Sequence, residues 1–135
     1  MKLAICAGQE NLKILNMLIL EYCSKCNCYP AIYSFENGES VFESMVKNKY
    51  EIIILVINKT ENIDIIKQIH CKDKNSKIIW FSDDKSLAAY AFENQVRYFA
   101  LTSISIEKLN DGLEQCGISK AETNICRVHI KAYEN

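Results

Sequence analysis

The stretch YEIIILVIN, Tyr50–Asn58, decides the fold class of this chain of 135 residues. It is a run of β-branched and apolar residues, too short to cross a membrane, with polar residues on both sides. Both faces of a strand must be apolar when helices cover both faces of its sheet, so the run predicts a buried central strand. In sheets of this kind, chemistry gathers at the carboxyl ends of the strands. Here that end is Val56-Ile57-Asn58, which offers no carboxylate, thiol or imidazole.

Other apolar runs of strand length alternate with stretches of helical spacing. The further predicted strands are Lys2–Cys6, Ala31–Phe35, Lys77–Phe81 and Val96–Leu101. Apolar spacing predicts helices over Gln9–Ser24, Glu39–Lys47, a stretch built on Ile63, Ile66 and Ile69, Ser86–Glu93, and Ile106–Cys116. Asn37-Gly38 is expected to form a turn, and Gly117 can end the last helix. Five strands alternating with five helices predict an α/β protein with one parallel sheet and right-handed crossovers.

Length and charge limit the class of protein. The length predicts one domain, 1–117, and the formal net charge of −1 gives no footprint for nucleic acid or a membrane surface. The opening MKLAIC is too quickly polar for a signal peptide, and no stretch is long enough to span a membrane, so we expect a cytoplasmic protein. Residues 118–135 form a tail in which Asn124–Ala132 alternates like a strand. This stretch could be an added strand, a linker or the start of a following, DNA-binding domain.

Cysteine is frequent in this chain. With no export signal, we expect reduced thiols in all seven positions. The segment CSKCNC, Cys23–Cys28, has spacings that could seed a zinc or redox site. No second pair with matching spacing follows, and His70 and His129 are isolated. We therefore expect no metal here, and small half-buried apolar side chains at a helix end. The cysteines are Cys6, Cys23, Cys26, Cys28, Cys71, Cys116 and Cys126.

Four stretches resemble the receiver domains of bacterial response regulators, most of all those that precede LytTR-type DNA-binding domains. KLAICAGQE is similar to the family's opening strand, which ends in Cys before two acidic residues. YEIIILVIN resembles the strand that bears the phosphorylated aspartate, and KIIWFSDD the strand that closes on Thr or Ser. SLAAYAFENQVRYFALTSI resembles the family's Tyr-Ala-x-x-Ala-Phe-Glu helix with its last strand and Lys-Pro-Ile end. The resemblance covers residues 1–116 and implies the doubly wound, flavodoxin-like and CheY-like (βα)5 three-layer sandwich.

The residues that perform phosphotransfer in that family are missing at the matching positions. A receiver holds Mg²⁺ with two acidic residues, accepts the phosphoryl group on an aspartate and grips it with a lysine, because an anionic group needs cationic partners. The resemblance places the acidic pair on Ala7 and Gly8, the phosphoacceptor on Val56 and the lysine on Thr102. The cis-forming proline falls on Ser103, and the loop after Val56 is shorter than the family's. We therefore expect a degenerate pseudo-receiver with no catalytic residue, metal or cofactor.

Two family positions keep a compatible side chain. Ser82 stands at the hydroxyl position and Phe99 at the aromatic switch position. We favour a strand-end cap or turn for Ser82, and core or rim packing for Phe99, over a functional role. Other carboxylates do not replace the lost ones. Glu10 is expected in the first turn of the first helix, and Asp83 and Asp84 look like capping residues before a helix.

The resemblance implies a non-catalytic, phosphorylation-independent signalling module, the receiver-like part of a LytTR-like transcription regulator. Such a module would act through protein contacts or as a homodimer, and it would reach DNA only through an attached domain outside this chain. In the family, the fourth helix, fifth strand and fifth helix commonly form the contact surface. The candidate contact residues on this surface are Leu87, Tyr90, Phe92, Tyr98 and Leu109.

One alternative to this function remains open, and a second is disfavoured. A free-standing adaptor would bind a kinase, phosphotransfer protein or regulator through the first helix, where apolar residues exceed the needs of one buried face. These residues are Ile14, Met17, Leu18 and Leu20. An enzyme on this fold would need a phosphate-cradling loop after the first strand, and AGQEN supplies one glycine and no hydroxyl. We therefore expect no enzyme, and nothing in the sequence lowers the pKa of a particular thiol for redox sensing.

Overall fold

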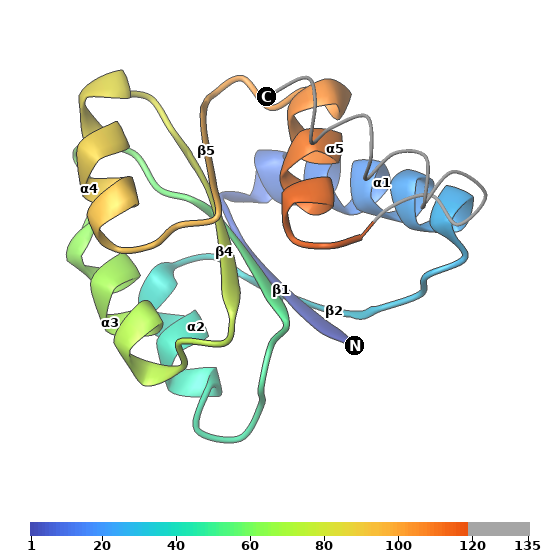
Figure 1. Ribbon diagram of the computed structural model, residues 1–135, viewed down its shortest axis with the longest axis horizontal. Coiled ribbons are helices and arrows are strands. Elements are labelled where there is room, and N and C mark those ends of the chain that lie inside the picture. The colour runs from blue at the N-terminus through green and yellow to red at the C-terminus, as the bar shows by residue number, and fades with distance from the viewer. Residues whose placement is uncertain (119–135) are drawn as a thin grey trace.

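The computed structural model describes residues 1–118, in which five parallel strands form one sheet. The strands are β1 (Lys2–Cys6), β2 (Ala31–Phe35), β3 (Ile52–Val56), β4 (Lys77–Ser82) and β5 (Tyr98–Leu101). They lie in the order β2-β1-β3-β4-β5 (Figure 1). This is the flavodoxin-like order, and it confirms the predicted fold class. The tail segment Asn124–Ala132 lies outside the described residues.

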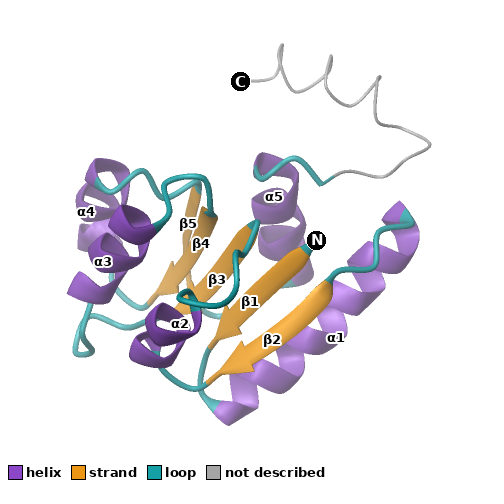
Figure 2. Cartoon of the chain, turned by 90° about the horizontal axis from the view of Figure 1, so that it is seen from below, coloured by secondary structure: helices purple, strands orange, loops and turns teal. Residues whose placement is uncertain are grey.

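Helices cover both faces of the sheet (Figure 2). On one face lie α1 (Gln9–Cys26) and α5 (Ile106–Gln115). The other face carries α2 (Gly38–Ser44), α3 (Asp64–Lys72) and α4 (Ala88–Glu93), with a short 3₁₀ turn, Lys85–Leu87, before α4. Within the described part of the chain, no helix has the length and apolar character that a membrane crossing requires.

The central strand β3 joins the two hydrophobic cores. Successive side chains of a strand point to opposite faces, so Ile52, Ile54 and Val56 enter the core under α1 and α5. Ile53 and Leu55 enter the core under α2, α3 and α4. All five residues are buried. This explains why the run is apolar at every position instead of alternating.

The ends of α1 and α2 depart from the predicted limits for identifiable reasons. Helix α1 passes the predicted end at Ser24 and stops where Asn27 takes a left-handed conformation, with φ of 53°. The predicted turn at Asn37-Gly38 is instead the start of α2, because the Asn37 side chain accepts a hydrogen bond from Ser40 N at 2.8 Å. A Cβ on Gly38 would lie 2.7 Å from Ile65 Cγ2, so glycine lets α2 approach α3 closely. Gly117, with φ of 94°, follows α5 as predicted.

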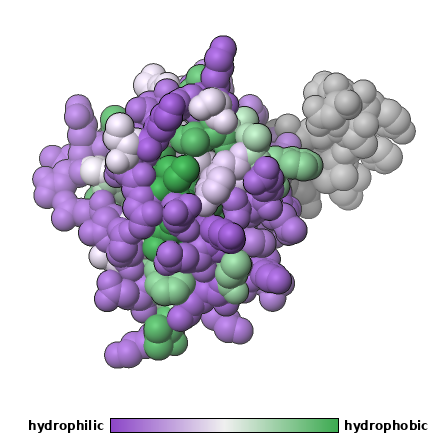
Figure 3. Space-filling model, turned by 90° about the vertical axis from the view of Figure 1, so that its left-hand side faces the viewer, coloured by the Kyte–Doolittle hydropathy of each residue, from purple (hydrophilic) through white to green (hydrophobic). Residues whose placement is uncertain are grey.

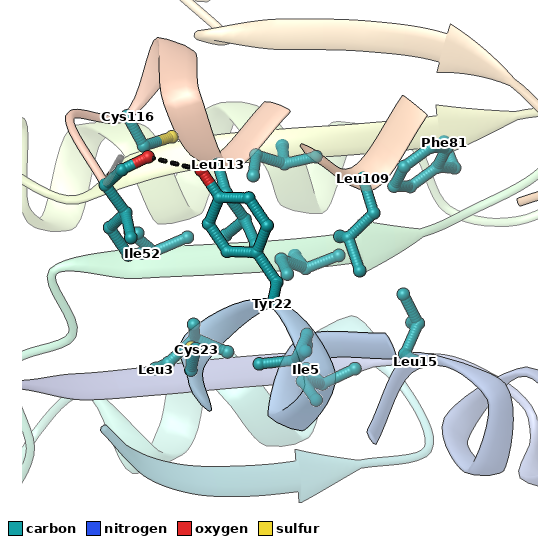
Figure 4. Close-up of a cluster of buried hydrophobic side chains, with 14 of the residues drawn as sticks. Leu3, Ile5, Leu15, Tyr22, Cys23, Ile52, Phe81, Leu109, Leu113 and Cys116 are labelled. Carbon is teal, nitrogen blue, oxygen red and sulfur yellow. Dashed lines mark hydrogen bonds between the residues drawn. The ribbon is translucent and has the colours of Figure 1, made fainter. Parts of the chain in front are cut away.

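The last described residue, Ile118, lies in the core under α1 and α5, called the first core from here on; the core under α2, α3 and α4 is the second core. Tyr22 of α1 is buried, and its hydroxyl donates to the Ile118 carbonyl at 2.7 Å (Figure 4). Ile118 itself is only 9% exposed. Ile118 therefore packs with the core under α1 and α5.

Candidate functional site

The positions matched to the receiver pocket meet at the carboxyl edge of the sheet, as the topology requires. Val56 and Ser82 are the last residues of β3 and β4, while Ala7 and Thr102 directly follow β1 and β5. Thr102 N donates to the Ser82 carbonyl at 2.9 Å, which joins two of these positions through the backbone. Gly8 precedes the first residue of α1.

Two of the side chains at this edge, Ala7 and Val56, are apolar and buried. Ala7 is 1% exposed and Val56 8%, and both belong to the core cluster that contains Phe81. Ser82 is fully buried, and its hydroxyl lies 3.5 Å from Asp83 Oδ1, a long and weak contact. Ala7 and Val56 therefore fill part of this edge with apolar side chains, whereas Gly8 is exposed and Thr102 is half-buried.

These side chains do not fit Mg²⁺, which the receiver fold implies. Magnesium takes hard oxygen ligands, usually carboxylates and waters. Ala7 and Val56 present methyl groups and Gly8 presents no side chain. Across residues 1–118, no group of three or more His, Cys, Asp or Glu side chains is placed to hold a metal ion.

The acidic residues near this edge are engaged in local structure. Asp84 caps the 3₁₀ turn by accepting from Ser86 N at 2.8 Å, which confirms its predicted capping role. That hydrogen bond, followed by the contact with Lys59, lowers the pKa of the Asp84 carboxyl to about 2. Asp83 Oδ1 accepts from Lys59 N at 2.9 Å, and Lys59 Nζ lies 3.0 Å from Asp84 Oδ2. Both carboxylates therefore hold the loop after β3 against the loop after β4.

One lysine near the edge was not found from the sequence. Lys108 of α5 reaches back to the β5–α5 loop, where its Nζ donates to the carbonyls of Leu101 at 2.6 Å and Ser103 at 3.0 Å. The peptide bond between Thr102 and Ser103 is cis. The Lys108 ammonium thus ties the start of α5 to the loop. The sequence could not show this contact, because Lys108 and Leu101 are brought together only by the path of the β5–α5 loop.

A small hollow lies beside this edge on the α2–α3 side. Its volume is about 40 Å³, room for little more than a water molecule. Burial, followed by the charges of Glu61 and Glu39, raises the pKa of the Cys6 thiol at this hollow to about 12. The thiol is therefore protonated at neutral pH. The lining residues are Cys6, Asn37, Gly38, Glu39, Ile57, Glu61, Asn62 and Ile65.

Phe99, at the aromatic switch position, packs against the second core, which lies under α2, α3 and α4. Its ring meets Trp80 edge-to-face with centroids 5.0 Å apart, and the side chain is half-buried. Trp80 is itself fully buried and donates from Nε1 to the Ile57 carbonyl at 2.9 Å. Phe99 therefore sits over a ring that is fixed in place beneath it.

The prediction of which residues form the contact surface was partly wrong. Leu109 is fully buried and Leu87 is 8% exposed, so these two belong to the cores and cannot present a surface. Tyr98 is half-buried and packs edge-to-face on Phe81. Tyr90 is half-buried, and its hydroxyl donates to Asp64 at 3.0 Å.

Phe92, at 84% exposed, is the predicted contact residue that does project from the molecule. Leu101, at 38% exposed, adds a second apolar side chain on the same elements, which the prediction missed. The surrounding face over α3 and α4 is mostly hydrophilic, with a narrow strip of hydrophobic side chains (Figure 3). The candidate surface is therefore narrower than the sequence suggested.

Comparison with solved structures identifies the architecture. The response regulator TrrA from Thermotoga maritima, solved with Mg²⁺ and beryllium fluoride, has a TM-score of 0.68 at 18% identity over 86% of this chain and 99% of its own. The response regulatory domain of mrkE from Klebsiella pneumoniae has a TM-score of 0.72 at 22% identity, covering 86% and 94% of the two chains. The fold is that of a response-regulator receiver domain.

A third solved structure has the same fold. A LuxR-family DNA-binding response regulator from Staphylococcus aureus has a TM-score of 0.64 at 21% identity, covering 86% of this chain and 98% of its own. At these identities the likeness establishes the receiver fold alone. No protein-family model matches the sequence, and comparison with curated proteins gave no match.

Proposed function

We propose that this chain is a receiver-fold signalling domain that works without phosphorylation, through protein contacts, as part of a LytTR-like transcription regulator. The observation that carries the proposal is Val56. It ends β3, where the resemblance expects the phosphoacceptor aspartate, and it is 8% exposed within an apolar cluster. A valine cannot form an acyl phosphate, and its apolar side chain offers no oxygen to the cation that phosphotransfer requires.

The surroundings of Val56 support the same proposal. Ala7 and Gly8 supply no oxygen ligand for Mg²⁺, and Thr102 supplies no ammonium. The amine of Lys108 is already bound to two backbone carbonyls. Asp83 and Asp84 are engaged with Lys59 and Ser86. The acidic pair, the phosphoacceptor and the lysine are therefore all replaced, and the nearby charged groups Lys108, Asp83 and Asp84 have other partners; Ser82 keeps the hydroxyl.

Acetyl phosphate, a small phosphoryl donor, tests the proposal chemically. We expect the intact mass of the chain to stay unchanged after incubation with acetyl phosphate and Mg²⁺, because no carboxylate is placed to accept the group. A receiver domain that keeps its aspartate and lysine serves as the positive control and should gain one phosphoryl mass. Stoichiometric gain of one phosphoryl mass by this chain, released at alkaline pH as an acyl phosphate is, would contradict phosphorylation-independent action.

A second candidate function is a free-standing adaptor that binds a partner through α1. The outer side of α1 exposes Met17 at 70%, Leu20 at 57% and Ile14 at 40%. Leu18, predicted with them, is half-buried and packs against the first core. Three exposed apolar side chains on one helix resemble the anchors by which helical surfaces bind partners.

Analytical sedimentation of matched variants shows whether self-association uses the α4–β5–α5 face or α1. If the α4–β5–α5 face forms a homodimer, Phe92→Asp should weaken self-association about tenfold or more, because a buried Phe contributes about 1.5–3 kcal/mol. The double substitution Met17→Asp with Leu20→Asp should then leave the dissociation constant unchanged. The reverse result, with association lost only in the α1 variant, would move the contact to α1 and favour the adaptor.

A further inference from the structure

The turn after α1 brings two cysteines close together. The helix ends at Asn27, whose left-handed conformation folds the chain back so that Cys28 N donates to the Cys23 carbonyl at 3.0 Å. This is the bond of a Schellman motif, in which the side chains of the two bonded positions commonly touch across the turn. In most proteins that pair is hydrophobic. Here the pair consists of two cysteines, joined across the turn by the backbone bond, and Cys28 packs against the core cluster that contains Cys23.

The two thiols differ in their access to solvent. Cys23 is 1% exposed and lies among the buried side chains of the first core (Figure 4). Burial is the main reason that the pKa of its thiol is raised to about 11, with smaller contributions from Cys28 and Cys26. Cys28 is half-buried at the edge of the same cluster, so it is the member of the pair that a small solute reaches. None of the six described cysteines is in a disulfide.

We propose that Cys23 and Cys28 are a modification site that forms a reversible intrachain disulfide when a hydroperoxide reaches Cys28. The Cys28 sulfur attacks the peroxide oxygen, the O–O bond breaks, and Cys28 becomes a sulfenic acid while water or an alcohol leaves. The Cys23 sulfur then attacks the Cys28 sulfur and displaces its oxygen, which leaves as water with the Cys23 proton. Two thiols are oxidised, one peroxide is reduced, and a thiol reductant reverses the bond.

The turn favours this pairing because the partner is already in place. A disulfide needs its two side chains to approach face to face, and a misplaced pair stores strain. The backbone bond between Cys28 and Cys23 holds the two residues next to each other across the turn, which brings their side chains to the same side of the helix end. The nearby Cys26 is buried on the last turn of α1, and the chain reversal at Asn27 directs Cys28 over Cys23. The bond would fix the end of α1 to the segment that enters β2, independently of any phosphotransfer.

Trypsin separates the two cysteines, which makes the site directly testable. Cleavage after Lys13, Lys25 and Lys47 puts Cys23 on one peptide and both Cys26 and Cys28 on the next. The full chain carrying Cys71→Ser and Cys126→Ser is treated with equimolar hydrogen peroxide, alkylated and digested; these substitutions remove an exposed thiol and one outside the described residues. We expect most molecules to lose the mass of two hydrogen atoms and to yield the two peptides linked, with full reversal by dithiothreitol.

Single substitutions in that background assign the bond. Cys26→Ser should keep the linked peptides, and Cys28→Ser should abolish them. Circular dichroism shows whether each variant is folded, and serine is close to cysteine in size. Loss of the link in folded Cys26→Ser, its survival in Cys28→Ser, or oxidation of Cys28 to sulfinic acid without a link would each overturn the proposal. Two-hydrogen loss confined to the peptide with Cys26 and Cys28 would overturn it as well.

Discussion

Val56→Asp should lower the free energy of unfolding by about 1–3 kcal/mol at neutral pH. Val56 is 8% exposed and shares an apolar cluster with Ala7 and Phe81. The new carboxylate would have no Mg²⁺ beside it, and the Lys108 ammonium is engaged with the carbonyls of Leu101 and Ser103. An unpaired carboxylate in such surroundings is penalised or forced to protonate.

The pH dependence of this effect has a definite sign. Burial disfavours the charged form, so the pKa of the new carboxyl should be higher in the folded than in the unfolded protein. The destabilisation is then fully present above the folded pKa and disappears as pH falls towards the unfolded value of about 3.9. Urea denaturation of wild type and variant at neutral and mildly acidic pH measures it. Val56→Asn, which has similar shape and no titrating group, should be destabilised without the pH trend.

An open, hydrated edge predicts a different outcome for the same pair of variants. A solvated carboxylate at position 56 would keep an ordinary pKa and cost little. Val56→Asp would then unfold at the same urea concentration as wild type at neutral pH. That result would show that the carboxyl edge admits water and would restore it as a place for a ligand.

Leu109→Ala should be the most destabilising substitution considered, at about 2–5 kcal/mol. Leu109 is fully buried between α5 and the sheet, so truncation removes apolar contacts and leaves a cavity. The matched control is Phe92→Ala on α4. Phe92 is 84% exposed, and its truncation should change the free energy of unfolding by less than about 0.5 kcal/mol. Denaturant unfolding of both variants decides whether Leu109 is core or surface, and small equal effects would return it to the contact surface.

The order and type of the elements could be predicted because hydrophobic periodicity reports which faces are buried. The limits of β3 could not be predicted by the same signal. Tyr50 and Ile57 are 2% and 3% exposed although they lie outside the strand, so burial continues past the last ladder position. Helix α5 shows the opposite case. Leu109 and Leu113, four positions apart and both fully buried, carry the helical period that identifies them as core.

Part of the candidate site could be predicted from the sequence, and part could not. Topology alone brings Ala7, Val56, Ser82 and Thr102 to one edge, because parallel strands end together. The contact of Lys108 with the β5–α5 loop and that of Cys23 with Cys28 depend on local chain reversals. A left-handed Asn27 is compatible with the sequence CSKCNC but is not specified by it.

Titration with beryllium fluoride and Mg²⁺, followed by backbone amide chemical shifts, tests the central claim most directly. Beryllium fluoride imitates a phosphoryl group only where a carboxylate, a cation and an ammonium receive it together. The apolar edge described here predicts no saturable shift at Ala7, Val56, Ser82 or Thr102, even in large excess of both ions. Saturable shifts that cluster at those four residues would show that the edge binds a phosphoryl mimic, and phosphorylation-independent action would be contradicted.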